Sequence, residues 1–490
     1  MTQSSIVSKW RVDSWVVIAV AALLAVLFYL IFSAVIFRIG FPLDDSWIHL
    51  TYARNLAEHQ EWAFRLGESS AGSTAPLWTV LLSIGFLIGL APYVWTYLLG
   101  WAVLTILAVY AEKFARRLVP SYRSPIPWAG LFFVFAWHLT WSAVSGMETL
   151  LHGLLILLVL GSLIDGSRRY LTLGFLTGLS IWVRPDGLTL LGPILFVALS
   201  TEQTWRQRGE AFFKTLIGFG SLFLPYLLFN LALSGNPMPN TFYAKQAEFA
   251  PFWQTLPFRE RVKDYLWPII ASPFLVLIPA ALIWLAKRIR AQHWGALASL
   301  IWVFGYFAIY FARLPAYQHG RYMIPALPVM YLWGILGLLE IVTSPKANRR
   351  LGFLWQVATV ALCIGFEFTG ARQNAYDIYW IESEMVTTAQ WIQQNVPPDA
   401  RLAVHDIGAL GFYVPNPLVD LAGLITPDVV PFIRDEGRLA GFLDSRSVDY
   451  LVSFPSLYPQ LTAQRESLFE AGLKFDALHF DENMHVYRWK

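Results

Sequence analysis

Long runs of uncharged, apolar residues constrain the fold of this chain more than any other feature. The first run covers residues 14–37 without a charged side chain, and about 20 such residues let a helix cross the hydrocarbon core of a bilayer. Similar runs recur up to about residue 370, and the mean hydropathy is +0.49. A composition of 56% hydrophobic and 14% charged residues excludes an ordinary soluble globular protein. The sequence therefore predicts an α-helical polytopic membrane protein.

Composition narrows the class further. The 22 Trp and 21 Tyr suit membrane interfaces, where an apolar ring lies in lipid and its N–H or O–H reaches water. The net charge of +3 is small, and the basic residues lie in short loops, which argues against nucleic acid as a partner. The single cysteine, Cys363, excludes an intramolecular disulfide and a multi-cysteine metal site. The first run is too long for a signal-peptide core, so we expect a retained helix.

Basic residues predict the topology, because Lys and Arg are retained on the cytoplasmic side. They cluster at Lys9 with Arg11; Lys113, Arg116, Arg117 and Arg123; Arg168 with Arg169; Arg206, Arg208 and Lys214; Lys287, Arg288 and Arg290; and Lys346, Arg349 and Arg350. If all the clusters face the cytoplasm, the segments between them cross the membrane in pairs.

The topology depends on the region between residues 76 and 112. Hydropathy alone suggests two spans there, broken at Ala91-Pro92, but two crossings would put the basic loop that follows outside. We therefore expect one crossing and a short, tilted or interfacial helix over 77–90. The predicted spans are 14–37, 93–112, 127–144, 149–164, 170–183, 187–200, 215–233, 267–286, 294–312, 322–343 and 351–370, about eleven helices with a cytoplasmic N-terminus.

The C-terminal quarter differs in kind from the rest. After residue 371 charge and proline rise, and strand-like and helical patterns alternate. The strand-like runs are 401–405, 417–422, 449–454, 474–480 and 485–490, and the helical patterns are 379–395 and 456–472. We expect a transmembrane domain, residues 1–371, with a first outer loop at 38–75, and a small extracytoplasmic α/β domain, residues 372–490.

Adjacent carboxylates in the first outer loop are the first candidate site. Asp44 and Asp45 follow the first span by seven residues, and acids so close to hydrocarbon are costly enough to indicate function. Either could instead cap a helix beginning at Ser46. In that helix Asp45 and His49 share a face. The small-residue loop at 69–75 would admit a ligand close to its backbone, which favours catalysis or donor binding over capping alone.

Other polar residues fall at predicted outer ends of spans. They are Glu148 in SGMET, Arg184 and Asp186 in VRPDG, and Tyr243 and Lys245 in PNTFYAK. Each has a structural alternative: the helix dipole favours Glu148 at a first turn, Arg184 and Asp186 can form an ion pair in a turn, and a loop lysine can simply be solvated. An outer arginine or lysine also suits a phosphate group.

Three further places carry candidate polar groups. His319 and Arg321, in YQHGRYMIP, stand at the outer start of a span, where an arginine can also snorkel to the interface. Arg54 lies in the first outer loop. His405 and Asp406 end a predicted strand, where ligand-binding residues often lie in α/β sheets, although a hydrogen-bonded pair is the favoured interpretation. The sequence has no Walker loop, G-x-S-x-G elbow, H-E-x-x-H or dinucleotide fingerprint.

These blocks carry a family resemblance. The segments DDSWIHLTYARNLAEHQEWAF, GSTAPLWTVLL, SGMETLLHGLL, VRPDG, PNTFYAK and GRYMIPALP, in this order, resemble blocks of the bacterial terminal arabinofuranosyltransferases of cell-wall arabinan. More broadly the chain resembles the GT-C superfamily of polytopic glycosyltransferases, which take a sugar from a polyprenyl-phosphate carrier. The match covers most of residues 38–330. Where the family usually has an acidic residue before the arginine of the late block, this chain has His319-Gly320-Arg321.

The resemblance implies a reaction and its residues. A sugar would pass from a lipid-linked monophosphate to an acceptor hydroxyl of a cell-envelope glycan, lipid or protein, on the outer face of the plasma or inner membrane. The catalytic aspartate falls on Asp44, or failing that Asp45, and we assign the general base to Asp44. Asp45 would orient the acceptor, assist the base or help to hold a divalent cation, Mg or Mn. Arg184, Lys245 and Arg321 would stabilise the departing phosphate. The remaining candidate substrate-binding residues are His49, Arg54, Glu148, Asp186, Tyr243 and His319.

Two other classes of protein remain open. A polytopic transporter or lipid-linked-sugar flippase would favour broken helices and charged groups at mid-membrane, whereas the polar candidates here lie at predicted outer ends. A non-enzymatic assembly or sensing protein would have no reason to place a carboxylate pair beside cationic loops. The prediction is therefore a membrane glycosyltransferase.

Overall fold

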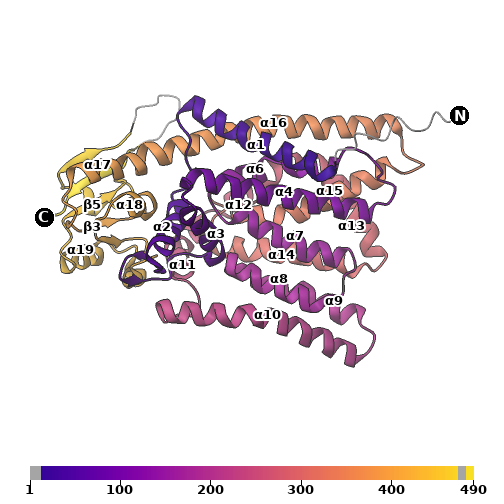
Figure 1. Cartoon of the computed structure of the whole chain (residues 1–490), viewed down its shortest axis with the longest axis horizontal. Coiled ribbons are helices and arrows are strands. Elements are labelled where there is room, and N and C mark those ends of the chain that lie inside the picture. The colour runs from indigo at the N-terminus through magenta and orange to yellow at the C-terminus, as the bar shows by residue number, and fades with distance from the viewer. Residues whose placement is uncertain (1–12, 473–481) are drawn as a thin grey trace.

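The computed structural model describes residues 13–472 and 482–490 and is mostly helical. Long helices run side by side in one body, and a small sheet lies at one end of it (Figure 1). Six segments of the described chain are long and apolar enough to cross a membrane. They are α1 (Ser14–Ile36), α4 (Pro92–Leu118), α10 (Trp205–Ser234), α14 (Trp294–Arg313), Gln318–Val342 with α15 (Leu327–Val342), and Arg349–Asn395, which begins with α16 (Arg349–Ile381). The chain is a multi-pass membrane protein.

A bent pair of helices replaces the single span predicted over 267–286. α12 (Phe258–Ile270) and the segment formed by η2 (Pro273–Leu277) with α13 (Ile278–Arg290) meet at 81°, and together they would make a seventh span. The break falls at Pro273, which has no N–H to continue the helix. The Ser272 hydroxyl accepts a hydrogen bond from the N–H of Phe274 at 3.2 Å and so starts the second helix.

Several apolar helices are shorter than a bilayer span. They are α3 (Pro76–Leu87), α7 (Thr149–Ile164), α8 (Tyr170–Val183), and η1 (Pro185–Leu190) with α9 (Leu191–Thr201). α3 matches the short helix predicted over 77–90. The span predicted over 127–144 is divided into α5 (Trp128–Val134) and α6 (Trp137–Val144), and the Thr140 hydroxyl donates to the Val134 carbonyl, which the break leaves free, at 2.7 Å. The prediction of about eleven membrane-spanning helices is therefore not confirmed.

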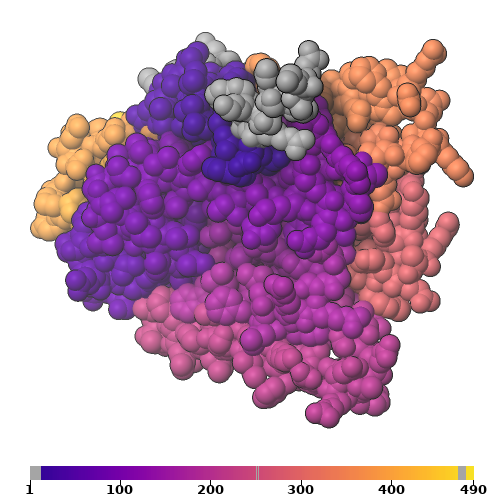
Figure 2. Space-filling view, turned by 45° about the vertical axis from the view of Figure 1, so that its right-hand side comes forward, coloured from indigo at the N-terminus to yellow at the C-terminus, as the bar shows by residue number. Residues whose placement is uncertain are grey.

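The elements that carry the candidate site lie between the helical body and the sheet (Figure 1). The first outer loop forms α2 (Asp45–His59) and a hairpin of β1 (Ala63–Arg65) and β2 (Glu68–Ser69). α11 (Asn240–Thr255) supplies Lys245, and η3 (Gln318–Gly320) with η4 (Ile324–Ala326) leads into α15. Segments from the first half of the chain, indigo to magenta, cover most of the face shown in Figure 2.

The last part of the chain contains a five-stranded sheet in the order β4-β3-β5-β7-β6. β3 pairs in parallel with β4 and β5, and β7 pairs antiparallel with β5 and β6. The strands are β3 (Leu402–Val404), β4 (Leu418–Asp420), β5 (Tyr450–Ser453), β6 (Ser467–Glu470) and β7 (His485–Arg488). The helices of this region are η5 (Glu382–Val386), α17 (Thr387–Asn395), α18 (Ile407–Tyr413), η6 (Pro427–Phe432), α19 (Glu436–Ser445) and α20 (Pro459–Thr462).

The predictions for this region are confirmed in part. The runs at 401–405, 417–422, 449–454 and 485–490 contain β3, β4, β5 and β7, and α17 falls within 379–395. The strand predicted over 474–480 lies outside the described residues. The helix predicted over 456–472 is wrong, because α20 and β6 occupy that stretch. β6 is held by pairing with β7 and by Phe469, whose ring stacks on that of Trp391 with 4.8 Å between the ring centres.

Candidate active site

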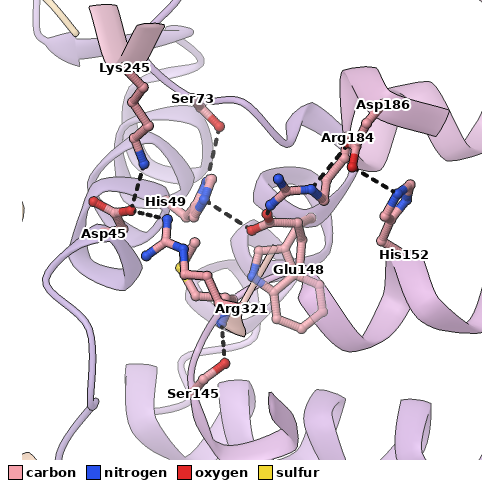
Figure 3. Close-up of polar contacts among 12 residues, drawn as sticks. Asp45, His49, Ser73, Ser145, Glu148, His152, Arg184, Asp186, Lys245 and Arg321 are labelled. Atoms are coloured by element: carbon pink, nitrogen blue, oxygen red, sulfur yellow. Dashed lines mark hydrogen bonds and ion pairs between the residues drawn. The ribbon is translucent and has the colours of Figure 1, made fainter. Parts of the chain in front are cut away.

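Asp45, at the start of α2, binds two cations that come from distant parts of the sequence. Its Oδ2 atom lies 3.0 Å from Lys245 Nζ on α11 and 2.5 Å from Arg321 Nη2 (Figure 3). The two cations follow Asp45 by 200 and 276 residues. Burial acts to raise the pKa of Asp45, but the charges of Lys245 and Arg321 outweigh it and hold that pKa well below its usual range. The carboxylate therefore stays ionised.

A second cluster lies beside the first and centres on Glu148, which precedes α7. Glu148 Oε1 accepts from Arg184 Nη1 at 2.8 Å, and its Oε2 lies 3.4 Å from His49 Nε2 (Figure 3). The other nitrogen of His49 lies 3.1 Å from the Ser73 hydroxyl. His49 is on α2, one turn after Asp45, so a single helix places groups in both clusters.

A tight turn before Glu148 allows its side chain to lie close to His49 on α2. Gly146 has φ of 79°, and a Cβ there would lie 2.8 Å from the Cβ of Ser46 on α2. The Ser46 hydroxyl donates to the carbonyl of Ser145 at 2.6 Å. Only glycine tolerates both the backbone conformation and the contact, so the turn fits against α2 and brings Glu148 to His49.

Asp186, in η1, links the second cluster to α7 and α14 of the helical body. Its Oδ1 accepts from Arg184 Nε at 3.2 Å, and its Oδ2 accepts from the hydroxyls of Tyr306 and Tyr310 at 2.6 and 2.7 Å. His152 Nε2 lies 3.5 Å from the same oxygen. Asp186 is thus a partly buried carboxylate with several partners, and its ion pair helps to orient Arg184.

Tyr322 joins the two clusters. The guanidinium of Arg321 lies 5.3 Å from the centre of its ring and that of Arg184 lies 5.6 Å from the same centre. Both arginines are therefore within cation–π range of one tyrosine. The three cations predicted from the sequence blocks therefore come together near the first-loop acid, Asp45. They are Arg184 from VRPDG, Lys245 from PNTFYAK and Arg321 from GRYMIPALP.

Asp44 has a different environment from its neighbour. Its Oδ2 accepts from the N–H of Gly408 at 2.7 Å, and its Oδ1 accepts from the N–H of Ala409 at 2.8 Å, both in α18. Burial, and after it the like charge of Asp406, raise the pKa of Asp44 to about 7, although the two N–H donors act in the opposite direction. A carboxyl that titrates near neutral pH is suited to proton transfer.

The strand-end pair His405 and Asp406 lies at the same junction. His405 Nε2 is 3.3 Å from Glu248 Oε1 on α11, and its Nδ1 is 2.8 Å from the Tyr458 hydroxyl. Burial is also the main reason why the pKa of Asp406 is raised. His405 thus makes its polar contacts with Glu248 and Tyr458, whereas Asp406 adds negative charge beside Asp44. The interpretation of His405 and Asp406 as a hydrogen-bonded pair stays a prediction.

Three candidates do not join the two clusters. Arg54 Nη1 donates to the Phe412 carbonyl at 2.7 Å and its guanidinium lies over the Phe412 ring, so it contacts α18. His319 Nε2 pairs with Asp377 at 2.7 Å. Tyr243 is 36% exposed on α11, with its ring against Phe242.

Sequence reasoning missed several residues of the second cluster. His152 follows Glu148 by four residues, so a helical i, i+4 spacing could have placed both on one face. Tyr306 and Tyr310 have the same spacing on α14. Gly408 and Ala409 act through their backbone N–H groups, which leave no sign in the sequence.

A divalent cation, which was one of the roles left open for Asp45, does not fit this arrangement. Asp45 is already paired with two cations, and both oxygens of Asp44 accept backbone N–H groups. Within residues 13–472 and 482–490, no group of three or more His, Cys, Asp or Glu side chains is placed to hold a metal ion. We derive no step through a metal.

Comparison with known proteins adds a partial match in sequence. Residues 373–487 match a family model described as a domain of unknown function, DUF8728. Over 228 residues the chain is 30% identical to the terminal beta-(1->2)-arabinofuranosyltransferase of Mycobacterium tuberculosis. That match covers 42% of this chain and 35% of the relative, so the chain matches about one third of the length of this curated protein.

Solved structures extend the likeness to nearly the whole chain. ArnT from Cupriavidus metallidurans bound to undecaprenyl phosphate has a TM-score of 0.63 at 14% identity, covering 97% of this chain and 98% of that one. The Archaeoglobus fulgidus oligosaccharyltransferase has a TM-score of 0.60 at 12% identity, covering 92% and 70%. The arabinofuranosyltransferase AftD from Mycobacteria has a TM-score of 0.56 at 16% identity, covering 97% and 40%. At these identities the likeness is one of fold.

Proposed function

We propose that this chain, which has the GT-C fold and resembles a terminal arabinofuranosyltransferase in sequence, transfers a sugar from a polyprenyl-phosphate donor to an acceptor hydroxyl at the extracytoplasmic membrane surface. One relative of the same fold was solved with undecaprenyl phosphate, which supports a donor of this class. The acceptor would be a cell-envelope glycan, lipid or protein.

The observation that carries the proposal is the carboxylate oxygen of Asp45 shared by Lys245 and Arg321. An ammonium carries three N–H donors and a guanidinium five, so each cation keeps donors for a phosphate after binding Asp45. The side chains of Asp45 and Lys245 are 27% and 22% exposed, so the pair is open to a ligand. Asp45 thereby holds the two cations at one point, where they would bind the donor phosphate.

The reaction requires a base on the acceptor and positive charge on the leaving group. The acceptor oxygen forms a bond to the anomeric carbon as the bond from that carbon to the phosphate oxygen breaks. Asp44 takes the hydroxyl proton, because its pKa of about 7 leaves it a stronger base than Asp45, whose pKa is depressed. The electron pair of the broken bond stays on the phosphate, where Lys245 and Arg321 stabilise the added negative charge.

The second cluster positions these groups. Glu148 and Asp186 neutralise Arg184 in a largely buried setting, and Arg184 lies near the same Tyr322 ring as Arg321. A buried ion pair that loses one partner costs about 3–5 kcal/mol, so this network is rigid. We assign Arg184 the role of extending the positive field around the phosphate and His49 that of contacting the sugar.

A transfer assay tests the proposal. Purified protein in proteoliposomes would receive a panel of polyprenyl-phosphate sugars and simple glycoside acceptors, with free polyprenyl phosphate and lengthened acceptor measured together. Both products should form from at least one donor. Movement of intact donor across the bilayer without cleavage of the sugar–phosphate bond would instead identify a flippase.

A further inference from the structure

A cavity lies away from the candidate active site, between α1, α5, α15 and α16. Its volume is about 1080 Å³, just above the usual range of about 300–1,000 Å³ for ligand pockets. Its wall is mostly apolar and aromatic, with Phe28, Trp128, Phe132, Phe353 and Phe368 among the lining residues. One end lies where α15 ends and α16 begins, at the end of the body opposite the sheet (Figure 1). We call this cavity the α15–α16 groove.

The mouth of the groove is polar and carries a cation. Arg123, Ser124 and Thr343 line it. Two other arginines of the same basic cluster are engaged, since Arg116 pairs with Glu112 and Arg117 with Asp165. Arg123, by contrast, is exposed and has no ion pair within residues 13–472 and 482–490. An arginine at the mouth of an apolar groove is complementary to an anion that carries a long apolar tail.

The deep end of the groove contains a carboxyl group. Glu367, on α16, is 6% exposed, and neither of its oxygens has a hydrogen-bond partner among the described residues. The neighbouring Thr140 hydroxyl donates to the Val134 carbonyl. An unpartnered carboxyl within a membrane span is rare and indicates a functional contact. Glu367 and Phe368 are the last residues along α16 that line the groove.

We propose that the α15–α16 groove binds one anionic phospholipid, with its headgroup phosphate at Arg123 and its acyl chains along the aromatic wall towards Glu367. The groove is lined by the end of α15 and the first part of α16, which lie at the other end of the body from α2 and α11 (Figure 1). Because α2 and α11 carry Asp45 and Lys245, the ligand of the groove is distinct from the sugar donor. The lipid would fill the space between α1, α15 and α16 and hold these spans together. The inference does not depend on the proposed transfer activity.

Native mass spectrometry of the full chain tests lipid selection. The probes are phosphatidylglycerol and phosphatidylcholine with identical acyl chains, added to delipidated protein in detergent. The wild type should retain one phosphatidylglycerol in preference to phosphatidylcholine. Arg123→Ala should weaken the retention of phosphatidylglycerol about fivefold, because the attraction of one arginine to an anionic lipid surface corresponds to an affinity change of about that size. Lys346→Ala, a cation at the same end that does not line the groove, should leave retention unchanged.

Two further measurements locate the lipid. Ala361→Trp places a bulky ring in the groove and should reduce retention of both lipids. A lipid-soluble carbodiimide should label Glu367 in delipidated protein, as mapped by peptide mass spectrometry, and phosphatidylglycerol should protect it. Equal retention of phosphatidylglycerol by the wild type and by Arg123→Ala would overturn the proposal. Protection of Glu367 by polyprenyl phosphate but not by phosphatidylglycerol would also overturn it, because that result would assign the groove to the sugar donor.

Discussion

At the scale of residues, Lys245 and Arg321 share the Oδ2 atom of Asp45. This contact predicts opposite changes in the affinity for polyprenyl phosphate when the acid and the lysine are replaced. In Asp45→Asn the competing negative charge is gone, so polyprenyl phosphate should bind more tightly. In Lys245→Ala one charged contact is lost, which corresponds to about 1.5–3 kcal/mol, or roughly ten- to a hundredfold weaker binding. Microscale thermophoresis of purified variants measures both.

A matched control distinguishes the loss of this contact from the loss of one positive charge elsewhere on the protein. Lys263 on α12 is an exposed lysine paired with Glu260 at 3.8 Å, and Lys263→Ala should leave the affinity for polyprenyl phosphate unchanged. If Asp45→Asn weakened binding as much as Lys245→Ala does, Asp45 would contact the donor directly and would not compete with its phosphate.

The raised pKa of Asp44 predicts the pH dependence of the reaction. A general base must be deprotonated, so kcat/KM should rise with pH and level off above about 7. Asp406 is one cause of the raised pKa, so Asp406→Asn should move the rise to lower pH. Initial rates across a pH series measure the shift. A profile that does not move in Asp406→Asn would mean that another group carries the proton.

The sequence predicted the residues of the acid and cation clusters, but not their hydrogen-bond partners. Asp44, Lys245 and Arg321 were recognisable because charged residues at the ends of apolar runs are conspicuous. The partners of Asp44 were not, since backbone N–H groups 364 and 365 residues away leave no pattern. For the same reason Arg54, predicted to bind substrate, could not be distinguished from a residue that contacts α18.

At the scale of elements, α8 and α10 pack with their backbones unusually close. Gly174 and Gly178 on α8 and Gly218 on α10 form the contact, and a Cβ at Gly218 would lie 2.1 Å from the Leu171 carbonyl oxygen. Such small residues let membrane helices approach each other.

Substitution tests this packing. Gly218→Leu should lower the free energy of unfolding by about 1–3 kcal/mol, because the side chain cannot fit against α8. Gly220→Leu is the control, since a Cβ at Gly220 meets nothing within 4 Å. Thermal unfolding in detergent compares the two. Equal melting temperatures for Gly218→Leu and Gly220→Leu would contradict the packing of α8 on α10.

Element boundaries were predicted where hydropathy changes sharply and missed where a helix bends within an apolar run. α7 and α8 begin and end at the predicted residues because charged or turn residues flank them. The bend at Pro273 and the break between Val134 and Trp137 lie inside apolar runs, which hydropathy cannot divide. β6 was predicted as helix because its partner strand, β7, determines its structure.

At the scale of the whole molecule, the sheet region contacts the helical body through α18. Asp44 binds its first N–H groups, Arg54 binds its Phe412 carbonyl, and the Trp47 ring lies 4.8 Å from that of Phe412. One candidate catalytic residue therefore depends on a contact between two distant parts of the chain.

This dependence can be tested without altering an ionisable group. A Cβ at Gly408 would lie 2.0 Å from the Asp44 carbonyl oxygen, so Gly408→Ala should displace α18, increase protease sensitivity near residue 408 and reduce sugar transfer. Gly441→Ala, on α19, meets nothing within 4 Å and should change neither property. Limited proteolysis and the transfer assay provide the readouts, and full activity in an undisplaced Gly408→Ala protein would contradict the role of α18.

The family resemblance seen in the sequence is confirmed by comparison with known proteins. The sequence blocks carry this resemblance because they keep their order along the chain, and the structures of ArnT and AftD are similar in fold over 97% of it. The sugar and the acceptor were not predictable, because they depend on the shape of a site assembled from α2, α11, η1 and the segment before α15.

The central claim is that first-loop acids and distant cations form one site for sugar transfer. It is tested most directly by the rate at which polyprenyl phosphate is released from a lipid-linked sugar by wild-type protein and by Asp44→Asn, with donor binding measured in the same samples. We predict release by the wild type, and donor binding without release by Asp44→Asn. Release at the wild-type rate by Asp44→Asn would contradict the claim.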